Sequence, residues 1–88
     1  MRLDRVRGAS IENSQRAQIE AMIVDMERRV LELDTAIETE EQQTGIHQPT
    51  HFAYSTIAMA MARRRDNLKQ SIDGLRRQLS DARATSNR

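Results

Sequence analysis

The chain contains no cysteine and no tryptophan, and its 88 residues include only one proline, three glycines and two aromatic residues. The absence of cysteine excludes a disulfide and any thiolate-bound metal, and it fits a reducing cytoplasm. No apolar run approaches the roughly 18 residues of a membrane span, and the basic segment 1–7 lacks the apolar centre of a signal peptide. We therefore expect a single small domain in the cytoplasm, with no membrane insertion.

Apolar residues recur at alternating spacings of four and three in two stretches of the chain. This spacing keeps one stripe of each helix facing a partner helix. The sequence therefore predicts an all-α fold, an antiparallel two-helix coiled-coil hairpin. The first stripe is formed by Ile19, Ile23, Met26, Val30, Leu33 and Ile37, and the second by Tyr54, Ala58, Met61, Leu68, Ile72, Leu75, Leu79 and Ala82.

Glycine, proline and N-cap residues set the expected limits of the two helices. Ser10 is a plausible N-cap for the first helix, and Gly45 is a natural stop. Pro49 disfavours helix at the preceding residue, so Thr50 is the better N-cap for the second helix and Ser55 the alternative. We predict a hairpin over residues 10–83, made of a helix at 10–44, a turn at 45–51 and a helix at 52–83, with a mobile segment at 1–9 and a frayed end at 84–88.

The net charge of +1 hides an asymmetry between the two halves of the chain. Residues 10–44 carry nine acids against three bases, and residues 45–88 carry eight bases against three acids. Opposite charges favour folding the helices back on each other. With the turn near residue 48, Val30 faces Arg65, whose guanidinium is expected to reach Glu27 or Asp34.

Three carboxylates, on Glu38, Glu40 and Glu41, lie at the C-terminal end of the first helix, where the helix dipole disfavours negative charge. We expect the arginine run at 63–65 to compensate them across the hairpin. Gly74 lies inside the second helix, where it is either tolerated on the outer face or marks a close approach of a partner.

Other chemistries have weaker support in the sequence. His47 and His51 are four residues apart, but Pro49 between them disfavours a metal-binding helical face. The bases of the second half lack the interleaved aromatic residues of a nucleic-acid site, and a cross-hairpin ion-pair face is favoured. Glu40 and Glu41 point in different directions around a helix, so they cannot act as an acid–base pair. We expect no catalysis, no cofactor, no metal and no nucleic-acid binding.

Apolar side chains outside the predicted seam indicate a surface for a protein partner, because one seam does not need them. Association of two copies into a four-helix bundle through the same residues is the rival explanation. The predicted interaction residues are Met22, Val24, Leu31, Ile57, Met59, Arg63 and Arg64.

Two segments whose residues are not determined by the heptad repeat resemble a known family. The tip TGIHQPTHFAYS, at 44–55, and the run RRDNL, at 64–68, together with the segment 17–28, are similar to the alphaproteobacterial branch of the flagellar export protein FliJ family. The resemblance covers about residues 15–82. It implies a non-catalytic coiled-coil stalk of the flagellar type III export apparatus, with the export ATPase, the export gate and export chaperones as partners at the flagellar base. The chain is short for that family, and its first residues differ from the expected start.

Two other functions remain open on the sequence. One is a small coiled-coil regulator that inserts its tip into a larger enzyme such as RNA polymerase. Such tips usually present acids at the turn itself, whereas here the acids lie before it. The other is a structural helical bundle that assembles from copies of this chain.

Overall fold

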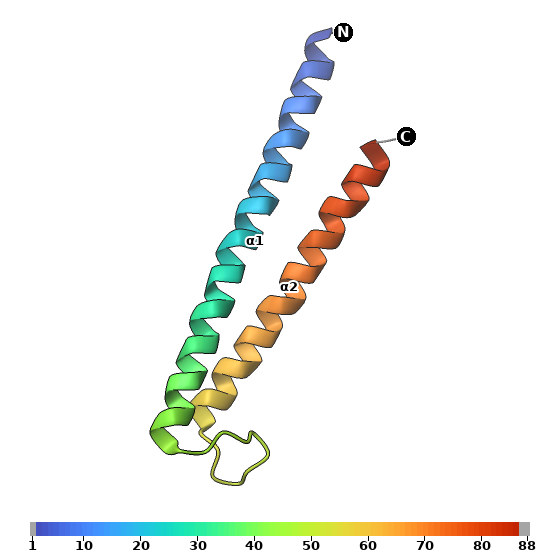
Figure 1. Ribbon diagram of the computed structural model, residues 1–88. Helices are drawn as coiled ribbons and strands as arrows, with labels where there is room; N and C mark the ends of the chain where they lie inside the picture. The colour runs from blue at the N-terminus through green and yellow to red at the C-terminus, as the bar shows by residue number, and fades with distance from the viewer. Residues whose placement is uncertain (1, 87–88) are drawn as a thin grey trace.

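The computed structural model describes residues 2–86 and the side chains of residues 13–82, and it forms two long helices joined by a loop (Figure 1). Helix α1 spans Arg2–Thr44 and helix α2 spans Thr56–Ser86. Helix α2 folds back along α1, so both chain ends lie at one end of a rod of 66 × 19 × 14 Å. The predicted all-α antiparallel hairpin is confirmed.

The seam between the helices is a narrow core in two parts. Ile23, Val30 and Ile72 form a buried cluster along the rod, flanked by partly buried Ile19, Met26, Leu68, Leu75 and Leu79. Near the loop, Ile37, Tyr54 and Ala58 form a second cluster. Every one of these residues belongs to the two heptad stripes, because the four–three spacing returns a residue to the same face at each step.

Helix α1 begins at Arg2, so the prediction that it starts at residue 10 is wrong. Ser10 lies inside the helix. Adding a turn to an existing helix costs far less than nucleating a new one, and a single interior glycine costs only about 1 kcal/mol relative to alanine. Gly8 therefore does not stop the helix.

The loop is longer than predicted and occupies residues 45–55. His51 N–H donates to the Gln48 carbonyl at 3.0 Å, and Tyr54 N–H donates to the His51 carbonyl at 3.0 Å, so the segment after Pro49 forms turns instead of helix. Ser55 is the actual N-cap: its hydroxyl accepts a hydrogen bond from Ala58 N–H at 3.2 Å. Helix α2 thus begins at Thr56, not at residue 52, and continues to Ser86, beyond the predicted end at 83.

Gly45 and Gly74 differ in backbone conformation. Gly45 has a φ of +74°, as expected for a glycine that ends a helix, and its N–H donates to the Glu41 carbonyl at 2.8 Å. Gly74 is helical, and no atom lies within 4 Å of the position a Cβ would take. It is therefore a tolerated residue on the outer face and not a point of close approach.

The longer loop shifts the pairing of the two helices. Arg65 contacts Asp34, and Val30 packs in the same core cluster as Ile72, so Val30 does not face Arg65 as predicted. Ile23 and Ile72 share one cluster, and Ile37 and Ala58 share the other, so the seam residues stay the same.

Candidate protein-interaction surfaces

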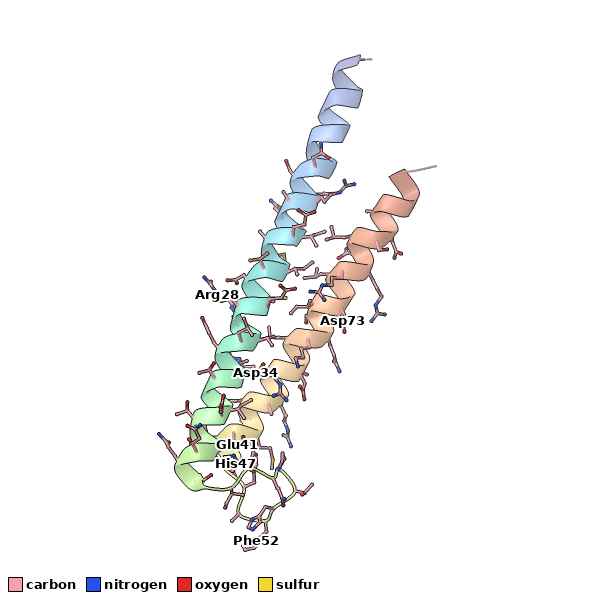
Figure 2. All side chains as sticks on the ribbon, in the orientation of Figure 1. Arg28, Asp34, Glu41, His47, Phe52 and Asp73 are labelled. Atoms are coloured by element: carbon pink, nitrogen blue, oxygen red, sulfur yellow. The ribbon has the colours of Figure 1, made fainter. Side chains whose placement is uncertain are left out.

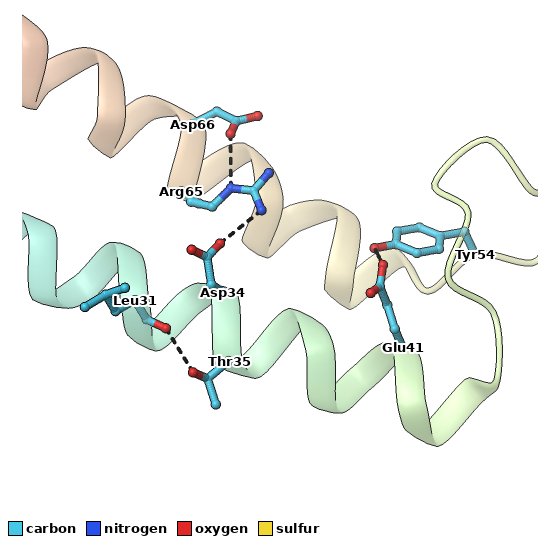
Figure 3. A network of polar contacts seen from close by, with 7 residues as sticks. All are labelled: Leu31, Asp34, Thr35, Glu41, Tyr54, Arg65 and Asp66. Atoms are coloured by element: carbon cyan, nitrogen blue, oxygen red, sulfur yellow. Dashed lines mark hydrogen bonds and ion pairs between the residues drawn. The ribbon is translucent and has the colours of Figure 1, made fainter.

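One side of the seam, called here the acid–base flank, carries opposite charges on the two helices. Its members are Glu27, Asp34 and Glu41 on α1 and Arg65, Lys69 and Arg76 on α2. Arg65 Nη1 lies 3.1 Å from Asp34 Oδ1, and Arg65 Nε lies 3.2 Å from Asp66 Oδ1 (Figure 3). Arg76 pairs with Glu27 farther along the rod. The predicted cross-hairpin ion pairs are confirmed for these residues.

Spacing in the sequence explains why the charges gather there. Glu20, Glu27, Asp34 and Glu41 are each seven residues apart, and so are Lys69 and Arg76. A seven-residue interval returns to the same face of a coiled-coil helix, beside the seam. The hydrogen bond to Asp34 raises the pKa of the Arg65 guanidinium, which remains charged. Ion pairs of this exposure contribute about 0–1 kcal/mol each, so the flank specifies orientation more than stability.

The tip compensates the carboxylates at the end of α1 with neutral donors. Tyr54 Oη–H donates to Glu41 Oε2 at 2.8 Å, and Ser55 Oγ–H donates to Glu40 Oε1 at 2.8 Å (Figure 3). His47 Nδ1 lies 3.8 Å from the other oxygen of Glu41. The expectation that the arginine run at 63–65 would compensate these acids is wrong, because Arg65 reaches Asp34 and the loop brings its own hydroxyls to the helix end.

The two histidines of the loop have separate roles. His51 Nδ1 accepts a hydrogen bond from Ala53 N–H at 3.0 Å, and its ring stacks on Phe52 with the centroids 4.7 Å apart. His47 instead lies beside Glu41 (Figure 2). Among the described residues no group of three or more His, Cys, Asp or Glu side chains is placed to hold a metal ion.

Phe52 is a surface residue that the sequence reasoning did not single out. Its side chain is 97% exposed and stands at the far end of the loop (Figure 2). Two features of the sequence could have identified it. It is the only phenylalanine of the chain, and it lies outside both heptad stripes, in the segment that contains the only proline.

Two predicted interaction residues form a ridge on α1, called here the α1 ridge. Val24 is 66% and Leu31 is 67% exposed, and they are seven residues apart on one face. Val24 lines a shallow recess together with Ala17 and Ala21, and Leu31 borders a groove between the helices whose floor is Val30 and Ile72. Each residue of the α1 ridge therefore borders a recess of its own, and the ridge lies next to the acid–base flank.

Three other predicted residues lie on the opposite side of the seam, called here the apolar flank. A recess there is lined by Arg29, Glu32, Leu33, Ala36, Arg64 and Leu68. Met22 is seven residues before Arg29, and Ile57 is seven before Arg64, so both extend this face. Met22 is 47% and Ile57 is 60% exposed.

The seven predicted interaction residues are therefore all exposed, but they do not form one surface. Met59 shares the heptad position of Asp66 and Asp73, at the outer edge of the acid–base flank. Arg63 lies on the outer face of α2, with Gln70 seven residues on. The sequence identified apolar residues that the seam does not need, but it did not separate the two faces.

Comparison with models of protein families, with curated proteins and with solved structures found no match. Neither helix, over its described residues, is long and apolar enough to cross a membrane.

Proposed function

We propose that this chain is a non-catalytic coiled-coil adaptor that acts through protein–protein contacts. The observation that carries the proposal is the α1 ridge, where two large aliphatic side chains, Val24 and Leu31, are each about two-thirds exposed on a rigid helix. Interface energy concentrates in a few well-packed, desolvated residues. A helix face with heptad-spaced anchors is suited to packing against another helix or a shallow apolar groove.

The resemblance of the tip and of the run at 64–68 to the FliJ family suggests which partners to try. On this basis the chain is a stalk-like component of the flagellar type III export apparatus, and it acts in the cytoplasm at the flagellar base. Its partners are the export ATPase, the export gate and export chaperones. A rod of 66 Å with a narrow cross-section is a shape that could enter the centre of a ring-shaped ATPase.

The test is light scattering coupled to size-exclusion chromatography of the chain mixed with the flagellar export ATPase of the same organism. Co-elution is expected for the native chain. Leu31→Glu should weaken the complex at least tenfold, because a charge replaces an anchor at the centre of the contact. Arg63→Glu, on the outer face of α2, is the control and should retain binding.

Two results would count against this proposal. A native chain that does not associate with the ATPase contradicts the export assignment. An association that Leu31→Glu leaves unchanged, with the variant folded by circular dichroism, contradicts the role of the α1 ridge. Neither result bears on how the chain behaves in the absence of other proteins.

A further inference from the structure

The hairpin exposes more surface than a compact protein of its mass. Its accessible surface is 7269 Å² for 10.1 kDa. A compact monomer of that mass exposes about 5,300 Å², so the excess is about 2,000 Å². A standard interface buries about 800 Å² on each partner, and this excess is large enough to supply one.

The seam itself is open to a further layer of helices. Of the residues along it, Leu33, Leu68 and Leu75 are only partly buried. A helix in a four-helix bundle packs two neighbours and covers such positions from the second side. The partial burial of seam leucines therefore indicates where an additional pair of helices would gain most from packing.

The two flanks of the seam are not equivalent as docking faces. The acid–base flank is crossed by the Arg65–Asp34 and Arg76–Glu27 pairs, which an apolar partner would have to desolvate. On the apolar flank, Arg29 is already paired with Asp25 of its own helix at 3.2 Å. The recess on this flank also holds Glu32 and Arg64, and its apolar residues are Leu33, Ala36 and Leu68, with Met22 and Ile57 on the same face.

Charge decides what can cover the apolar flank. On this flank α1 carries Glu32 and the Asp25-paired Arg29, and α2 carries Arg64. A second copy placed face to face by a two-fold axis along the rod sets each α1 against the partner's α2, so the Glu32 side of one copy faces the Arg64 side of the other at both contacts. An axis perpendicular to the rod sets α1 on α1 and α2 on α2, so Glu32 and Arg64 of the two copies do not meet.

We propose that two copies of this chain pair through the apolar flank, with both tips at the same end, into a four-helix bundle. Glu32 and Arg64 line the same recess, so they lie at the same height on the rod. In this arrangement Arg64 of each copy lies at the height of Glu32 on the other. The α1 ridge and Phe52 remain exposed in the bundle, so the dimer does not depend on the proposed function and does not compete with it.

Light scattering of the chain alone, over a range of concentrations, tests the dimer. The native chain is expected to show twice the mass of 10.1 kDa. Ile57→Glu should reduce the mass to that of one chain with helicity retained, since an acid in the first turn of a helix is favourable. Val24→Glu has the same charge change and nearly the same exposure, but it lies on the α1 ridge and should remain dimeric.

A native chain that stays monomeric at every concentration overturns the proposal, and so does dissociation by Val24→Glu but not by Ile57→Glu. The orientation has a separate test. Because the chain has no cysteine, Thr50→Cys gives a single spin-label site at the tip. Same-end pairing predicts a label-to-label distance well below the 66 Å length of the rod, whereas a distance near that length shows opposite ends.

Discussion

At the scale of single residues, two glycines are expected to respond to the same substitution in opposite ways. Gly74→Ala should raise the free energy of unfolding by about 1 kcal/mol, because the site is helical and nothing lies near the new Cβ. Gly45→Ala should lower it by about 1–2 kcal/mol, because its φ is +74°. Chemical denaturation followed by circular dichroism measures both. Equal effects of the two substitutions would contradict this account of the helix end.

Tyr54 links the stability of the tip to alkaline pH. The hydrogen bond it donates to Glu41, followed by desolvation, raises the pKa of its phenol above the usual value of 10.0. A group whose pKa is higher in the folded chain than in the unfolded chain stabilises the fold below the unfolded pKa. That contribution is lost as the pH rises through the folded pKa.

We therefore expect thermal stability to fall above about pH 10, and to fall less steeply in Tyr54→Phe. The phenylalanine ring keeps the packing against Ile37 and Ala58 and removes only the titrating hydroxyl. Melting curves of the two proteins from neutral to alkaline pH are the measurement. Parallel pH profiles would show that another group controls the alkaline transition.

At the scale of the helices, the two faces of α1 should differ in their sensitivity to the same truncation. Val30 is 8% exposed in the seam, whereas Val24 is 66% exposed on the α1 ridge. Val30→Ala should cost about 2 kcal/mol through lost burial and the cavity it leaves. Val24→Ala should stay within about 0.5 kcal/mol. Urea denaturation of both variants measures the difference, and a larger loss at Val24 would place the seam on the wrong face.

The seam residues could be predicted because apolar residues recur with the heptad, and this pattern identifies them even when the pairing of the helices is misjudged. The ends of the helices could not be predicted, because they depend on competition among local contacts. Ser55 caps α2 in preference to Thr50 only because turns at Gln48 and His51 occupy the preceding residues. Helix α1 continues through Ser10 because extending an existing helix costs less free energy than nucleating a new one.

The candidate surfaces, too, were predictable only where they follow from the heptad repeat. Exposure of the apolar residues outside the stripes followed from the heptad, but their separation into two faces depends on the hand of the hairpin and the pairing of its helices. The loop also exposes a residue that the sequence analysis did not predict to be part of a surface, Phe52. Phe52 belongs to no repeat, so its exposure was visible only once the turns around His51 were in place.

At the scale of the whole molecule, the hairpin is a rod with three distinct surfaces around one thin core. The acid–base flank pairs opposite charges across the two helices, and we propose a second copy for the apolar flank and a different protein for the α1 ridge. Few of its side chains are deeply buried: Ala58 alone is fully covered among the described residues. The proposed association would therefore contribute a larger share of stability than it does for a compact domain.

The position of both chain ends at one end of the rod determines how the molecule responds to force (Figure 1). A load that pulls the two ends apart opens the contacts between α1 and α2 one after another, beginning far from the loop. The Arg76–Glu27 pair separates before the Arg65–Asp34 pair, and the Tyr54–Glu41 hydrogen bond at the tip separates last. When the load is released, the helices close again from the loop, where closing the chain costs the least entropy.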